Sequence, residues 1–123
     1  MIHFDTNFLI QALVPGTTAE AQMQGWLGSG EDLGISTIAW AEFLCGPLNA
    51  QSRVLADQLF SKPEPFLQND AEQAAQLFNQ GGRRSRSLPD CMIAATAIRL
   101  GAKLATHNRT DFSDFQGRGL EVA

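Results

Sequence analysis

The sequence has few cysteines and no zinc-binding pattern. Cys45 and Cys91 are the only two cysteines among 123 residues, and each stands among apolar residues in a segment typical of a helix. Cysteine in such a setting usually behaves as a small buried hydrophobic residue, so we expect no disulfide. Neither cysteine has a histidine at the spacing that zinc sites require, so any bound metal should have oxygen ligands.

The sequence also lacks a long apolar run. His3 and Asp5 interrupt the first apolar segment, and no segment approaches the roughly 20 apolar residues that cross a bilayer. Nothing near the first residue has the pattern of a signal peptide. We therefore expect a soluble, cytoplasmic protein.

Positive charge is scarce. Lys and Arg number 9 against 13 Asp and Glu, which gives a net charge of −4. Proteins that bind nucleic acid usually present a basic face, so this balance argues against such a ligand at first sight. Net charge alone does not decide the question, because acids gathered around a cation are neutralised there. The basic residues also include one cluster, at Arg83, Arg84 and Arg86.

What is present indicates one folded domain. Hydrophobic residues make up 44% of the chain and charged residues 18%, with no linker-like stretch and no internal repeat, so residues 1–123 are expected to form a single domain. The patterns predict strands over 2–4, 33–36, 103–106 and 120–122, an extended piece over 63–67, and helices over 5–14, 18–27, 37–45, 50–60, 70–81, 89–100 and 111–115. This alternation predicts an α/β fold with a parallel sheet between two layers of helices.

Four acidic residues, Asp5, Glu42, Asp90 and Asp111, fall near the carboxyl ends of predicted strands. Asp5 directly follows the first strand, and Glu42 lies in the early turns of the helix after the second. Asp90 begins a helix antiparallel to the strand over 103–106, and Asp111 follows that strand. Ligands of open α/β sheets bind outside the carboxyl ends of the strands, so we expect the four carboxylates to converge there.

Three of these acids have an equally good structural interpretation. Asp5 precedes a helix and is a preferred capping residue. Asp90 stands three residues after Ser87, and Asp111 three after Asn108, which is the spacing of a capping box. Glu42 differs, because it is embedded in the apolar segment IAWAEFLC, and a carboxylate in such surroundings should be desolvated, paired or bound to a metal.

Clustered carboxylates raise one another's pKa unless a cation lies among them. Magnesium or manganese prefers oxygen ligands and leaves coordination positions for phosphate oxygens. Such a site can activate a water and stabilise charge on a leaving oxygen, with one ion or with two ions about 3.5–4 Å apart. Phosphodiester hydrolysis is the reaction that this chemistry favours.

Four motifs, taken in order, resemble those of the PIN-domain family and, within it, the VapC toxins. They are DTNFLI, AEFLCG, LPDCMIAATAIRLGAKLAT and THNRTDF, and the resemblance covers nearly the whole chain. It implies a five-stranded parallel sheet and an endoribonuclease that uses Mg²⁺ or Mn²⁺ at Asp5, Glu42, Asp90 and Asp111. It also implies that polar neighbours hold the carboxylates or metal-bound waters in place, and these are Thr6, Asn7, Thr106 and Asn108.

The resemblance further implies structured RNA, such as transfer RNA, as substrate, a cognate antitoxin as inhibitor and a homodimer as the assembled form. In that case Arg83, Arg84 and Arg86 are candidate contacts to RNA phosphates, although a solvated loop explains them equally well. His107 stands beside the acidic edge and is a candidate RNA contact, while Asp114 is a weaker candidate for a fifth carboxylate. Neither histidine is assigned a catalytic role.

Two other classes with carboxylates at strand ends fit the sequence poorly. A signalling receiver domain needs adjacent acids after the first strand and a lysine at the end of a late strand, whereas Lys103 begins one. A phosphatase of the haloacid dehalogenase type needs an aspartate two residues after Asp5, where Asn7 stands. The serious alternatives lie within the same family: a PIN nuclease of RNA processing or decay that has no antitoxin, or a PIN domain that mainly binds.

Overall fold

Short strands alternate with helices along nearly the whole chain. The computed structural model describes residues 1–81 and 88–123, with the backbone alone for Asp111 and Asp114. In this part of the chain the elements are β1 (Ile2–Phe4), α1 (Thr6–Ala12), α2 (Thr18–Gly28), β2 (Leu33–Ile35), α3 (Thr37–Cys45), α4 (Ala50–Leu59), α5 (Gln68–Gln80), α6 (Leu88–Leu100), β3 (Lys103–Ala105), α7 (Arg109–Gln116) and β4 (Glu121–Val122).

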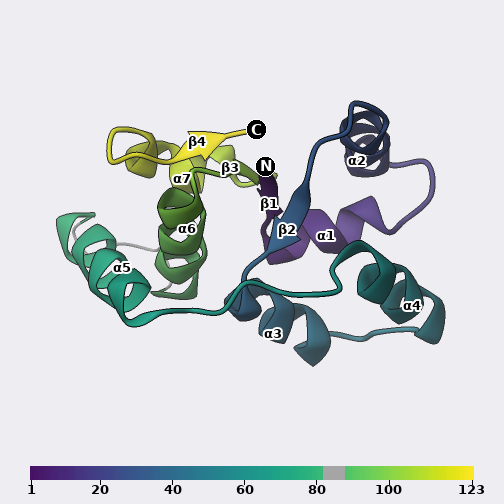
Figure 1. The fold of residues 1–123 in the computed structure, drawn as a ribbon, viewed down its shortest axis with the longest axis horizontal. Coiled ribbons are helices and arrows are strands. Elements are labelled where there is room, and N and C mark those ends of the chain that lie inside the picture. The colour runs from purple at the N-terminus through teal and green to yellow at the C-terminus, as the bar shows by residue number, and fades with distance from the viewer. Residues whose placement is uncertain (82–87) are drawn as a thin grey trace.

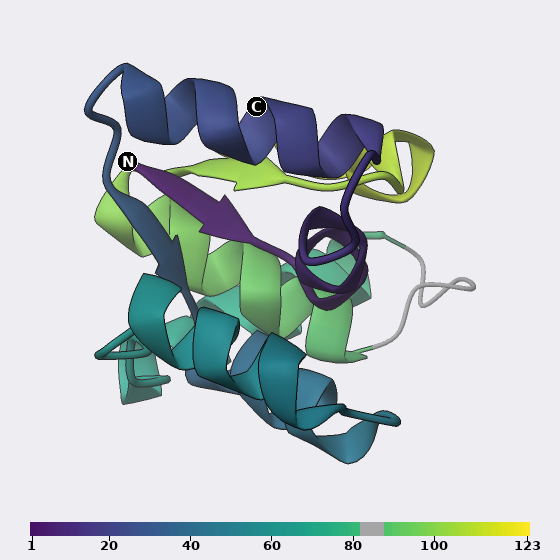
Figure 2. The same cartoon turned by 90° about the vertical axis from the view of Figure 1, so that its right-hand side faces the viewer.

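The strands form one parallel sheet in the order β2-β1-β3-β4. Phe4, the last residue of β1, pairs with Ile35 of β2 and with Ala105 of β3, so the carboxyl ends of three strands lie level. Helices α1 and α2 lie on one side of the sheet and α5 and α6 on the other, as Figure 1 shows, and Figure 2 looks onto the sheet from the side of α1 and α2. The predicted three-layer α/β/α fold is confirmed.

The sheet has four strands in the described residues, one fewer than the resemblance implied. The extended piece predicted over 63–67 does lie beside β2, but it pairs there only through an isolated parallel bridge between Ser36 and Glu64. The Glu64 N–H donates to the Ile35 carbonyl at 2.8 Å, and the Thr37 N–H donates to the Glu64 carbonyl at 2.9 Å. The bridge lies at the end of β2, because Thr37 begins α3, so the ladder does not continue past this point.

Side-chain caps set the beginnings of the helices. Thr17 accepts a hydrogen bond from Glu20 N at 3.1 Å, and Ser36 accepts one from Ala39 N at 3.1 Å, which starts α2 and α3 where the sequence predicted. Helix α5 begins at Gln68, two residues before the predicted start. Asp70 lies inside its first turn and reaches back to accept from Leu67 N at 2.9 Å. Asp70 therefore caps the helix from within instead of preceding it.

Aromatic residues fill the core between the sheet and the layer of α1 and α2. The Phe4 ring contacts Phe8, Trp26 and Phe60, with ring centres 4.9, 6.0 and 5.5 Å away. On the other face, the alanines of α6 are almost fully buried. Close packing on both faces of the sheet fixes where the carboxyl ends of the strands lie.

Both cysteines are free thiols, so no disulfide forms, as predicted. Cys91 is buried, but Cys45 is exposed, contrary to the expectation that both would behave as buried residues. The reason is its position as the last residue of α3, where the helix leaves the core. No helix in the described part of the chain is both long and apolar enough to cross a membrane.

Candidate functional site

A small polar cavity of about 110 Å³ lies where β1 and β2 deliver the chain into α1 and α3. It brings together three of the four predicted acids, each from a different helix or helix start. Its lining is Asp5, Thr6, Asn7, Glu42, Asp90, Ile93 and Asn108. The level carboxyl ends of the central strands are the reason that residues far apart in the sequence meet here.

Asp5 is the most buried carboxylate of this cavity, with 5% of its surface exposed. Its Oδ1 accepts a hydrogen bond from Phe8 N at 2.7 Å, so the capping interpretation is correct, and the same side chain still borders the cavity. Burial raises the pKa of Asp5, and the charge of Asp90 raises it further, against hydrogen bonds from Thr106 and Phe8 that lower it. A cation beside Asp5 would offset both unfavourable effects.

Glu42 is exposed, so the inference that its apolar neighbours in the sequence surround its carboxylate is wrong. Its apolar neighbours in the sequence lie on other faces of α3, among them Ala39 and Phe43, which are buried in the core. The carboxylate instead faces the cavity and accepts a hydrogen bond from Thr6 Oγ1 at 2.7 Å. Glu42 is thus a paired, solvated acid and not a desolvated one.

Asp90 lies in the first turn of α6 and is half-buried. Its charge contributes to the raised pKa of Asp5, which shows that the two carboxylates are near one another. Ser87, its predicted partner in a capping box, lies outside the described residues. Helix α6 lies on the opposite side of the sheet from α1, so Asp90 and Asp5 reach the same cavity from different layers.

The polar neighbours predicted to hold the acids fall into two pairs. Thr6 donates to Glu42, and Thr106 donates to Asp5, so each hydroxyl fixes one carboxylate. Thr106 Oγ1 also accepts from Asn108 N at 2.9 Å, which shapes the turn after β3. Asn7 and Asn108 border the cavity itself, and the Asn108 side chain makes no capping hydrogen bond to α7.

Several predicted residues fall outside what the structure describes. Asp111 lies in α7, but its side chain and that of Asp114 are outside the described part, so the fourth ligand stays a prediction. Arg83, Arg84 and Arg86 also lie outside the described residues.

His3 is buried in β1, with 2% of its surface exposed, and burial lowers its pKa to about 4. It is therefore uncharged at neutral pH. A Cβ atom at Gly34, its partner in β2, would come within 2.7 Å of His3 Nε2, so the ring fits only because glycine stands there. These contacts give His3 a structural role.

The donor set of the cavity fits a hard divalent cation, because its polar groups are carboxylates, a hydroxyl and amides. Among the side chains that the structure describes, however, no three Asp, Glu, His or Cys residues are grouped closely enough to hold an ion by themselves. The two observations are compatible, because magnesium commonly takes only one or two carboxylates and completes its shell with water and phosphate oxygens.

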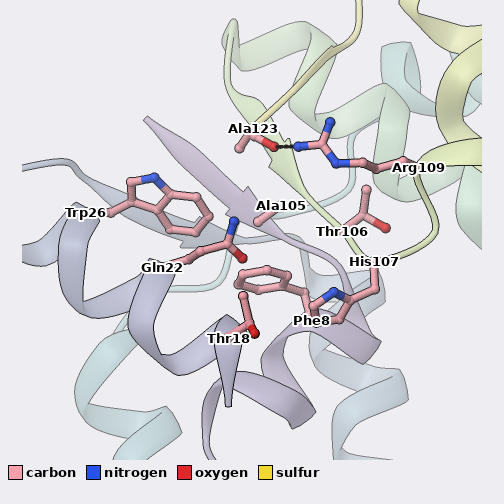
Figure 3. Close-up of a pocket in the computed structure, with 9 residues that line it drawn as sticks. All are labelled: Phe8, Thr18, Gln22, Trp26, Ala105, Thr106, His107, Arg109 and Ala123. Atoms are coloured by element: carbon pink, nitrogen blue, oxygen red, sulfur yellow. Dashed lines mark hydrogen bonds between the residues drawn. The ribbon is translucent and has the colours of Figure 1, made fainter. Parts of the chain in front are cut away.

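Sequence reasoning missed a second, larger cavity of about 400 Å³ beside the first. Figure 3 shows its walls: Gln22 and Trp26 come from α2, Phe8 from α1, and His107 and Arg109 from the segment after β3. Trp26 contacts Phe4 and Phe8 in the core, and it also borders this cavity. An exposed glutamine on a helix carries no sequence signal, so Gln22 could not have been found.

Comparisons with known proteins agree on one family. The family model described as "PIN domain" matches residues 2–117. A toxin–antitoxin complex from Klebsiella pneumoniae contains a chain that is 28% identical, with a TM-score of 0.75, and the match covers 95% of this chain and 94% of that one. FitAcB from Neisseria gonorrhoeae matches at 27% identity and a TM-score of 0.71, over 100% and 97%.

VapC20 from Mycobacterium tuberculosis, described as a sarcin-ricin loop cleaving toxin, shares the fold at 18% identity and a TM-score of 0.69, over 100% of this chain and 98% of that one. A search of curated proteins found no significant match.

Proposed function

The chain belongs to the PIN-domain family, and from this premise we propose that it is an endoribonuclease dependent on Mg²⁺ or Mn²⁺ and the toxin of a toxin–antitoxin pair. The observation that carries the nuclease assignment is the convergence of Asp5, Glu42 and Asp90 on one small polar cavity. The toxin assignment rests on similarity to a chain solved in a toxin–antitoxin complex.

In this proposal Asp5, Glu42 and Asp90 bind the metal, directly or through metal-bound water, with Asp111 as the fourth ligand that the family motif implies. When bound, a divalent ion supplies a water of lowered pKa as nucleophile and balances negative charge on the phosphate and the leaving oxygen. The protein's own part is to present charged carboxylates in fixed positions.

Thr6 and Thr106 fix those positions. The Thr6 hydroxyl restrains Glu42, which would otherwise be a freely rotating exposed side chain. The hydrogen bonds from Thr106 and Phe8 N lower the pKa of Asp5 and so favour its charged form against the effect of burial. Support of this kind around metal ligands commonly changes metal affinity or activity by about 10–100-fold.

Metal removal tests the nuclease. We expect purified, antitoxin-free protein to cut single-stranded or structured RNA in Mg²⁺ or Mn²⁺, to lose activity in EDTA and to recover it when the ion is returned in excess. Labelled RNA resolved on a denaturing gel measures this. Cleavage that persists in EDTA, or no cleavage with either ion, contradicts the proposal.

An apolar groove between α1, α2 and α4 supports the antitoxin partner. Three adjoining cavities of about 250–280 Å³ lie there; Leu13 lines all three, and Val14 and Leu55 each line two of them. Ile10, Val14, Leu27 and Leu55 are exposed along it, although each is a large apolar side chain. Exposed apolar residues gathered in a groove are typical of a protein interaction site. We propose that an apolar segment of the antitoxin lies in it.

Leu55→Glu tests this groove, and Val54→Glu is its matched control. Both residues are exposed on α4, at 41% and 54%, but only Leu55 borders the cavities. We expect Leu55→Glu to raise the Kd for the cognate antitoxin by at least about tenfold, because a charge is introduced into an apolar contact. RNA cleavage should stay unchanged in both variants. Equal binding by both variants contradicts the groove assignment.

Genomic context separates the toxin from a processing nuclease of the same fold. A small adjacent gene for a DNA-binding protein favours the toxin, and a solitary gene counts against it. The homodimer and the identity of the RNA substrate remain proposals that rest on the family.

A further inference from the structure

We propose that the larger cavity, lined by Phe8, Gln22, Trp26, His107 and Arg109 among others, binds one base of the RNA strand next to the scissile phosphate. This inference rests on the proposed nuclease function and adds a site of sequence preference to it. The cavity is called the base pocket below. Its volume, about 400 Å³, lies within the range of about 300–1,000 Å³ typical of small-molecule sites.

The base pocket and the acidic cavity are lined by neighbouring residues of the same two segments. Asn108 lines the acidic cavity, while Thr106, His107 and Arg109 line the base pocket. In α1, Thr6 and Asn7 border the acidic cavity and Phe8 borders the base pocket. The Asp5 N–H donates to the Ala105 carbonyl at 3.1 Å, which holds the two segments side by side. A base that flanks the scissile phosphate is therefore the part of the substrate that we place in the base pocket.

The wall of the base pocket suits a flat aromatic ligand. Trp26, Phe8 and His107 form a continuous row, with ring centres 5.7 and 5.0 Å apart and successive rings tilted by 31°. Phe8, the middle ring, is buried, while Trp26 is half-buried and His107 is exposed, so the two outer rings are the ones open to a ligand. Unpaired RNA bases bind proteins by stacking on such side chains, and every base has a face that can stack.

The rim supplies hydrogen bonds and positive charge. Thr18, Gln22 and Arg109 are exposed around the opening, and none of the nine lining residues is Asp or Glu. Figure 3 shows Gln22 extending between Trp26 and Phe8, and Arg109 on the far wall hydrogen-bonded to the Ala123 carbonyl. An amide side chain offers a donor and an acceptor together, which is the pairing that reads the edge of a base such as adenine.

The two cavities differ in the charge of the residues that line them. The acidic cavity repels phosphate until a cation neutralises it, whereas the described lining of the base pocket includes Arg109 and no Asp or Glu. In a chain of net charge −4, a cationic side chain beside the acids favours a phosphodiester strand over a purely apolar ligand. We therefore assign the pocket to the nucleotide that flanks the cut.

Gln22→Ala tests the base pocket, with Gln24→Ala as the matched control on the same helix. Both glutamines are exposed on α2, but Gln24 borders only the apolar groove. Binding of the labelled pentaribonucleotides A5, C5, U5 and a G-containing mixture is measured in Mg²⁺ by fluorescence polarisation, on full-length protein that also carries Asp5→Asn. We expect Gln22→Ala to raise the Kd of the tightest-binding probe about tenfold and to reduce the differences in Kd among the probes. Gln24→Ala should change neither.

Cleavage kinetics in the otherwise unmodified protein provide the second measurement. Gln22→Ala should raise KM about tenfold with kcat within about twofold, because the residue binds substrate and does not touch the reacting atoms. Equal behaviour of the two glutamine variants overturns the base pocket. Two other results also overturn it. One is 5′-AMP binding as tightly as A5, which would indicate a site for a free nucleotide. The other is a Gln22→Ala protein that loses affinity for the antitoxin and not for RNA.

These outcomes separate the two proposals. If the protein cleaves RNA normally and Gln22→Ala changes neither RNA binding nor KM, the base-pocket proposal is wrong and the nuclease proposal stands. RNA binding that depends on Gln22, in a protein that cuts no RNA with either ion, supports the pocket and removes the nuclease.

Discussion

Asp5→Asn is expected to lower kcat/KM for RNA cleavage by about 10²–10³-fold, as removal of one charged or hydrogen-bonding group from a reactive site typically does. The substitution removes the charge of the most buried carboxylate in the cavity. It keeps the oxygen that accepts from Phe8 N, and asparagine caps helices as well as aspartate does, so α1 should form normally. Loss of activity would then report on the site and not on folding.

Two comparison variants and a folding check make this result decisive. Asp90→Asn should lose activity similarly, because Asp90 borders the same cavity. Asp57→Asn is the matched control, since Asp57 is an exposed acid of α4 paired with Arg53 outside the cavity, and it should cut RNA like the unmodified protein. Circular dichroism checks that all three variants fold. An Asp5→Asn protein that cuts RNA at the normal rate would show that Asp5 only caps α1.

The positions of the acids were predictable because they depend on local signals. A strand of three residues followed by a capping residue sets the direction of the chain, and parallel pairing then brings the strand ends together. The sequence could therefore place Asp5, Glu42 and Asp90 at one edge without any knowledge of packing. Their roles as metal ligands remain predictions.

The features that could not be predicted depend on which face of a helix a residue occupies and on contacts between residues that are distant in the sequence. Glu42 looked desolvated because its neighbours in the sequence are apolar, yet a helix turns those neighbours into the core and leaves the acid exposed. The extended piece over 63–67 does not form a fifth strand in the described residues, because it pairs only at Ser36, where β2 gives way to α3, and the family pattern does not show this. The base pocket joins α1, α2 and the turn after β3, so no single segment contains its signal.

Asp70 is a further acid whose environment the sequence did not reveal. Its surface is 1% exposed, and it lies between α5 and α6, where its Oδ1 accepts from Arg99 Nε at 2.8 Å. Arg99 Nη2 also donates to the Pro65 carbonyl at 3.1 Å and lies 3.3 Å from a Glu64 oxygen. One guanidinium thus ties α5, α6 and the segment beside β2 together, on the far side of the sheet from α1 and α2.

Arg99→Met is expected to lower the free energy of unfolding by about 3 kcal/mol, because it leaves the buried Asp70 charge without its partner. Urea unfolding followed by circular dichroism measures this. Asp57→Asn, which breaks the exposed pair with Arg53, should cost less than about 1 kcal/mol. Adding Asp70→Asn to Arg99→Met should restore part of the loss, since no buried charge then remains, whereas Asp70→Asn alone should destabilise the protein. Arg99→Met and Asp57→Asn of equal stability would show that the buried pair contributes no more than a surface one.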